Sequence, residues 1–153
     1  MNTEPIAREL LRALRGPRSQ VAWSRRLGYR SNVAYAWESG RRWPTAAETL
    51  RAATRAGHDV RSALERFYRE PPAWLDEHVD PTTPEAVAAL LVDLKGSGSI
   101  TDLAQRAGVS RYAVSRWLSG TTQPRLPDFL RVVEASYLRL VDLLTELVET
   151  ESL

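Results

Sequence analysis

Four side chains between residues 111 and 116 have the types and spacing needed to bind a polyanion and to read base edges. Tyr112, Ser115 and Arg116 follow Arg111 by one, four and five positions. This spacing places all four side chains on one side of a helix. A guanidinium can donate two parallel hydrogen bonds to a guanine or a phosphate, and a phenol or hydroxyl can add single ones. The expected chemistry is therefore non-covalent recognition of duplex DNA in the major groove.

The segment that must position these side chains predicts two short helices joined by a tight turn. Ser99 can cap the first helix, and Gly108 follows it where a left-handed backbone is needed to turn sharply. Ser110 can cap the second helix, in which Val114 and Trp117 lie three positions apart and face inward. A helix pair of this kind is expected to present residues 111–116 outward.

The run from Ala104 to Pro124 resembles the lambda-repressor-like (Cro/cI, XRE) helix-turn-helix family. The pattern that carries the resemblance is A-x-x-x-G-V-S-x-x-x-V-S-R-W-x-x-G-x-x-x-P. The resemblance implies an all-α fold whose second motif helix enters the major groove. It also implies sequence-specific binding of double-stranded DNA by a bacterial or phage-type transcriptional regulator, with repression favoured over activation.

The same motif occurs twice, because the chain matches itself without a gap at an offset of 80 positions. The repeat predicts two tandem five-helix helix-turn-helix domains, at residues 1–70 and 84–153, joined by a Pro-rich linker at 71–83. The matching residues include Gly16 with Gly96, Gly28 with Gly108, Trp37 with Trp117, Gly40 with Gly120, and Pro44 with Pro124.

The first copy carries weaker base-reading side chains than the second. Ser31 is the expected N-cap of its outer helix, and Ser31, Asn32 and Tyr35 are the expected readers. Asn32 could make a bidentate contact to adenine, and Tyr35 could touch a thymine methyl or a phosphate. Ala36 stands where the second copy has Arg116, which predicts modest base readout by this helix.

Phosphate contacts are expected mainly from the first copy. In the family that the motif resembles, a glutamine at the position of Gln20 bonds a phosphate, whereas the second copy has Ile100 there. The loop after the outer helix commonly lies along the phosphate backbone in that family, and here it carries adjacent arginines. The predicted phosphate-contacting residues are Arg18, Gln20, Arg30, Arg41, Arg42 and Arg125.

Charge is distributed unevenly along the chain. Residues 1–70 hold fourteen arginines and seven acidic residues, a formal charge of +7, whereas the remainder carries −5. Because neutralising phosphates drives most of the affinity for duplex DNA, the first half is the expected electrostatic partner of nucleic acid.

Catalysis, metals and cofactors find no support in the sequence. Cysteine is absent, and the two histidines, His58 and His78, lie in a turn and in the linker with no nucleophile spaced around them. We therefore expect a protein that is not an enzyme, with no cofactor, metal or small-molecule ligand. Without a signal-like or membrane-spanning segment, a cytoplasmic location is expected.

Two alternatives stay open at this stage. Trp74 and Leu75 are expected to pin the linker to one domain or to fill the seam between domains. Apolar residues from Phe129 to Val148 predict either packing between the domains or a homodimer through the C-terminal helix. Because fold alone does not determine function, a protein-protein interaction module on a helix-turn-helix scaffold is the alternative function.

Overall fold

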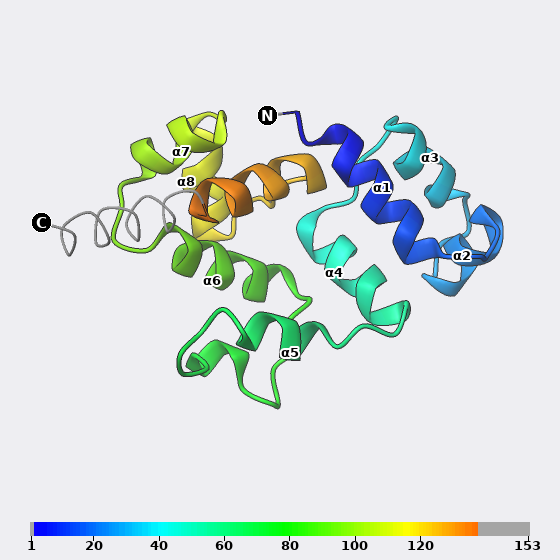
Figure 1. The fold of residues 1–153 in the computed structure, drawn as a ribbon, viewed down its shortest axis with the longest axis horizontal. Coiled ribbons are helices and arrows are strands. Elements are labelled where there is room, and N and C mark those ends of the chain that lie inside the picture. The colour runs from blue at the N-terminus through cyan, green and yellow to red at the C-terminus, as the bar shows by residue number, and fades with distance from the viewer. Residues whose placement is uncertain (1, 138–153) are drawn as a thin grey trace, which may run out of the picture.

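The computed structural model describes residues 2–137, and these residues fold as helices joined by short connections (Figure 1). The predicted all-α fold is confirmed for this part of the chain. Residues 126–137 are also helical. The other elements, in chain order, are α1 (Glu4–Arg15), α2 (Gln20–Arg26), α3 (Val33–Ser39), α4 (Ala46–Arg55), α5 (Val60–Glu65), the short 3₁₀ helix η1 (Ala73–Leu75), α6 (Pro84–Lys95), α7 (Ile100–Ala107) and α8 (Arg111–Ser119).

Helix starts are set by local capping residues. The Ser19 side chain accepts a hydrogen bond from the Ala22 amide at 3.1 Å, and Ser99 caps α7 in the same way. Thr45 and Glu48 form a reciprocal capping box at the start of α4, in which each side chain accepts from the other residue's amide at 3.1 Å. These bonds satisfy amides that have no partner within the helix, which fixes where α2, α4 and α7 begin.

The offset of 80 residues is preserved in the structure. Helices α1 and α6 correspond residue for residue, α2 and α7 begin at equivalent positions, and α3 and α8 end at equivalent positions. Gly16 follows α1 with φ 64° and ψ −141°, and Gly96 follows α6 with φ 60° and ψ −143°. A positive φ of this kind favours glycine, so the repeated glycines direct the chain into the next helix in the same way.

The two halves meet through a reciprocal pair of backbone hydrogen bonds. The Ala46 amide donates to the Pro124 carbonyl at 3.0 Å, and the Leu126 amide donates to the Pro44 carbonyl at 2.8 Å. The bonds flank an isolated antiparallel bridge between residues 45 and 125. Because 44 and 124 are equivalent in the repeat, as are 46 and 126, each half makes the same contact to the other.

Side chains at this junction complete the core of the opposite half. Ala46 and Ala47, at the start of α4, are buried with residues of α6, α7 and α8. Leu126 is buried against Ala7, Leu11 and Trp37 of the first half. The Gln123 side chain also accepts from the Ala47 amide at 3.0 Å. The two halves therefore share their cores.

The linker is anchored at the seam between the halves. Leu75 is buried with Val60 and Leu64 of the first half and Leu90 of the second. The Trp74 indole nitrogen donates to Asp93 of α6 at 2.8 Å. Of the two positions expected for this pair, Leu75 occupies the seam between the halves, while Trp74 bonds to the second half.

Phe67 departs from the expected packing. The sequence places Val60, Leu64 and Phe67 on one inward face, but α5 ends at Glu65 and the Phe67 side chain is 68% exposed. Phe67 instead lines an apolar cavity of about 560 Å³ together with Ile6, Leu130 and Tyr137. The helical periodicity that predicted burial fails because the helix stops before reaching this residue.

Two sequence predictions fall on residues 138–153, outside the described part of the chain. They are the fifth helix of the second half and most of the apolar face that was predicted to pack between the domains or to form a homodimer. Phe129 and Leu130, at the start of that face, pack against the buried cluster that contains Ala7 of the first half. Among the described residues, every helix is too short or too polar to span a lipid bilayer.

Candidate nucleic-acid interface

Helix α8 presents the predicted polar set on the face opposite its buried residues. The Ser110 side chain accepts from the amides of Tyr112 and Ala113 at 3.1 and 3.2 Å, which starts the helix where the sequence predicts. Val114 and Trp117 are buried in the core. Four exposed side chains project from the other side of the helix, namely Arg111, Tyr112, Ser115 and Arg116.

Arg111 and Tyr112 form one unit on this face. The Arg111 guanidinium donates to the Tyr112 phenol oxygen at 3.2 Å and lies 5.1 Å from the ring centroid. A cation–π interaction therefore adds to the hydrogen bond in holding the two side chains together. Tyr112 is nevertheless 64% exposed, so the pair remains accessible to a ligand.

Helix α3 begins later than the sequence predicts. Its N-cap is Asn32, not Ser31, and the Asn32 side-chain oxygen accepts from the Tyr35 amide at 3.2 Å. The reason is a longer turn, because residues 27–32 separate α2 from α3 whereas only 108–110 separate α7 from α8. Ser31 and Asn32 are both exposed, at the start of the helix.

The N-cap role limits what Asn32 can do. A bidentate contact to adenine requires both the oxygen and the nitrogen of the carboxamide. Here the oxygen already accepts from the Tyr35 amide, and the Ser24 hydroxyl oxygen lies 3.3 Å from it, so the bidentate contact would compete with the cap. The Nδ2 group of Asn32 is the part of this side chain that is left to meet a base.

Tyr35 and Arg41 are brought together although the helix ends between them. Tyr35 is 46% exposed on α3, and the Arg41 guanidinium lies 5.5 Å from its ring centroid. Arg42 and Arg30 are exposed as well, and Ala36 is half-buried. The exposed face of α3 therefore carries one aromatic ring with a cation stacked on it.

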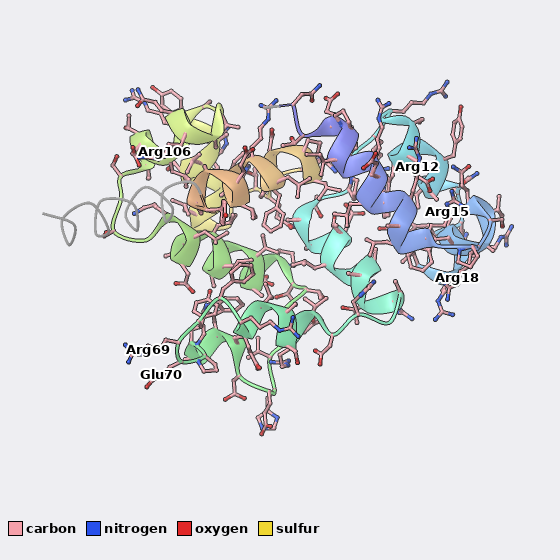
Figure 2. All side chains as sticks on the ribbon, in the orientation of Figure 1. Arg12, Arg15, Arg18, Arg69, Glu70 and Arg106 are labelled. Carbon is pink, nitrogen blue, oxygen red and sulfur yellow. The ribbon has the colours of Figure 1, made fainter. Side chains whose placement is uncertain are left out.

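The remaining predicted phosphate contacts are less closely grouped. Arg18 lies over the Trp23 ring at 5.5 Å, and Gln20 is half-buried at the first position of α2. Arg125 is exposed but donates to the Trp43 carbonyl at 2.9 Å, which places it at the junction between the halves. Arg12, Arg15 and Arg18 follow one another beside α1 and α2 (Figure 2).

Two groups that the sequence reasoning missed hold α3 in position. The buried Ser24 hydroxyl of α2 accepts from the Ala34 amide at 3.0 Å and donates to the Gln20 carbonyl at 2.8 Å. Arg15 donates twice to the buried Glu38 carboxylate, at 2.9 and 3.0 Å, and once to the Arg18 carbonyl at 2.7 Å. The only sequence signal for the ion pair is an acidic residue beside the inward Trp37.

The second half keeps the bond from the last residue of its first helix to the following loop, but it lacks the ion pair. The Lys95 ammonium donates to the Gly98 carbonyl at 2.8 Å, and these two residues are equivalent to Arg15 and Arg18. Leu118 stands in the position of Glu38 and is half-buried against the core. Apolar packing thus takes the place of the ion pair behind α8.

The turn before α3 is also tied to the start of α4. The Tyr29 hydroxyl donates to Glu48 at 2.6 Å. Burial and this hydrogen bond raise the pKa of Tyr29 to about 12. Burial opposes ionisation of Glu48, but hydrogen bonds from Tyr29 and Thr45 outweigh it and lower the pKa of the carboxyl.

This geometry combines exposed guanidiniums and phenols with firmly packed helices. No protein-family model, curated protein or solved structure matches this chain. The residues and their arrangement are therefore what indicates the function of this protein. Within residues 2–137, no group of three or more His, Asp or Glu side chains is arranged to hold a metal ion.

Proposed function

We propose that this protein binds double-stranded DNA sequence-specifically and acts as a transcriptional regulator through two tandem helix-turn-helix domains. In this proposal α2 with α3 and α7 with α8 are the two motifs, and α3 and α8 are the recognition helices. The observation that carries the proposal is the outer face of α8, where Arg111, Tyr112 and Arg116 are exposed on a helix that is capped at its start and packed on its other side. Arginine paired with guanine is the commonest specific contact in the major groove.

The first half supports the proposal through charge. Its formal charge of +7 comes entirely from arginines outnumbering acidic groups, and Arg30, Arg41 and Arg42 are exposed near α3. Phosphate contacts from such residues fix register and orientation on the duplex, whereas base contacts supply sequence preference. We therefore assign most base readout to α8 and a larger share of the phosphate contacts to the first half.

The proposal is tested by selecting bound duplexes from a random pool at two salt concentrations. We expect a defined sequence to be enriched at both, because base contacts persist when counterion release is weakened. If no sequence is enriched and binding disappears at the higher salt concentration, the proposal is wrong and a protein-protein interaction module becomes the better interpretation.

A further inference from the structure

The two halves are related by an approximate twofold rotation. In a twofold contact, residue i of one unit meets residue j of the other while j of the first meets i of the second. The pair of backbone bonds at the junction has this form, since residues 46 and 124 are joined and so are their equivalents, 126 and 44. A head-to-tail arrangement would instead join unlike surfaces in one direction only.

Side-chain packing follows the same rotation. Ala46 is buried with Val87, Leu91 and Trp117. Their equivalents, 80 positions earlier, are Ala7, Leu11 and Trp37, and these three are buried with Leu126, the equivalent of Ala46. Backbone and side chains therefore define one pseudo-twofold axis, which passes through the bridge between residues 45 and 125.

The rotation also relates the two proposed recognition helices. Helices α3 and α8 lie on opposite sides of the junction and toward the same upper side of the view, whereas α5 lies on the lower side (Figure 1). Two helices related by a twofold axis read the two strands of a duplex in opposite directions. An operator for such a pair mirrors that symmetry.

We propose that one chain, acting alone, recognises an inverted pair of non-identical half-sites. This inference rests on the proposed DNA binding and specifies the arrangement of the DNA. Inversion follows from the pseudo-twofold axis. Non-identity follows from the two faces, because Arg116 of α8 is replaced by Ala36 on α3, and the Asn32 oxygen is used as a helix cap.

The two half-sites have different expected chemistry. The α8 half-site contains guanine, which the guanidiniums of Arg111 and Arg116 can contact bidentately. The α3 half-site is less strictly defined, because Tyr35 and the stacked Arg41 offer apolar and phosphate contacts more than paired hydrogen bonds to a base. Its contribution to affinity is largely electrostatic and therefore salt-dependent.

The experiment uses the 153-residue chain and duplexes built from the selected sequence. One duplex carries the half-sites in inverted orientation, a second carries them as a direct repeat at the same spacing, and a third carries the guanine-containing half-site alone. We expect the inverted duplex to bind about a hundredfold more tightly than either other duplex, because the second contact is made only when geometry permits both. Light scattering of the complex should give one chain per duplex.

A variant separates this arrangement from a symmetric one. Arg116→Ala, at an exposed position of α8, should change the enriched bases in one half-site and leave the other unchanged. Circular dichroism provides the control for folding. A direct repeat bound equally well, two chains on each duplex, or an Arg116→Ala effect on both half-sites would overturn the inference while leaving DNA binding intact. Failure to enrich any sequence would instead overturn the proposed function.

Discussion

Arg15 and Glu38 form a bidentate ion pair between the end of α1 and the end of α3. The Glu38 carboxylate is buried, and its two oxygens accept from Nη2 and Nε of Arg15. The Nε atom of Arg12 lies 4.0 Å from Oε1 of the same carboxylate. This hydrogen bonding raises the pKa of Arg15 above its usual value despite the opposing effect of burial. The pair is specific to the first half, because Lys95 and Leu118 stand in the equivalent positions. It fixes the last turn of α3 relative to α1.

Arg15→Ala should destabilise the protein. It would leave the buried Glu38 carboxylate without two of its donors, and because Arg15 itself is only half-buried the expected cost is about 1–3 kcal/mol. The measurement is urea unfolding followed by circular dichroism. Arg25→Ala, at an exposed position of α2, is the matched control and should change the free energy of unfolding by less than about 0.5 kcal/mol. Equal effects of the two substitutions would show that the ion pair does not stabilise α3.

Arg116→Ala and Arg41→Ala should affect DNA binding differently if the proposed function is correct. Loss of Arg116 should weaken binding of the selected sequence by about 1–3 kcal/mol and leave binding of unrelated duplexes nearly unchanged. Loss of Arg41 should weaken binding of all duplexes alike and reduce the salt slope by about one. Fluorescence anisotropy with both kinds of duplex measures the difference. Equal losses on every sequence for both variants would contradict specific readout by α8.

Leu126→Ala should destabilise the first half although Leu126 lies in the second. The side chain is buried against α1 and α3, and truncating a buried leucine costs about 2–5 kcal/mol. Amide hydrogen exchange should accelerate in α1 and α3. Val92→Ala removes a half-exposed apolar side chain from α6 and serves as the control, with an effect below about 1 kcal/mol. Unchanged exchange in α1 would show that the halves do not share a core.

Tyr29→Phe should alter the pH dependence of stability at alkaline pH. A hydroxyl whose pKa rises from 10.0 to about 12 on folding contributes stability that is complete below pH 10.0 and lost between pH 10.0 and about 12. At pH 8 the variant should be less stable by about 1 kcal/mol, the net value of one hydrogen bond. The difference in stability between the variant and the unchanged protein should shrink between pH 10.0 and about 12. Thermal unfolding at a series of pH values measures it.

The unchanged protein, measured over the same pH range, is the reference for this titration. A stability difference that stays constant between pH 10.0 and about 12 would show that the Tyr29–Glu48 bond does not raise the pKa of the phenol.

Local sequence features predicted the helices well, and tertiary contacts decided where the predictions failed. The caps at Ser99 and Ser110 were both predicted from residues within four positions of one another, and both side chains accept hydrogen bonds from the expected amides. Ser31 and Asn32 are both good N-caps, so the choice of Asn32 depended on the turn length and on Ser24, which no local pattern encodes.

The arrangement of the candidate site depended on contacts between distant residues. The outward positions of α8 could be predicted from helical spacing because Val114 and Trp117 fix the inward side. The junction at residues 44–46 and 124–126 could not be predicted, because backbone pairing across 80 residues leaves no periodic signal. The Arg15–Glu38 pair was missed for the same reason.

The shared cores have a consequence for how the protein is made. As the chain leaves the ribosome from its N-terminus, residues 1–70 emerge well before Leu126, the side chain that is buried against Ala7, Leu11 and Trp37. In the nascent first half these apolar side chains therefore stay exposed to solvent until more than fifty further residues have been translated. The core of the first half is completed only after Leu126 has been synthesised. A polypeptide released before that point would keep an exposed apolar surface and be prone to aggregation and proteolysis.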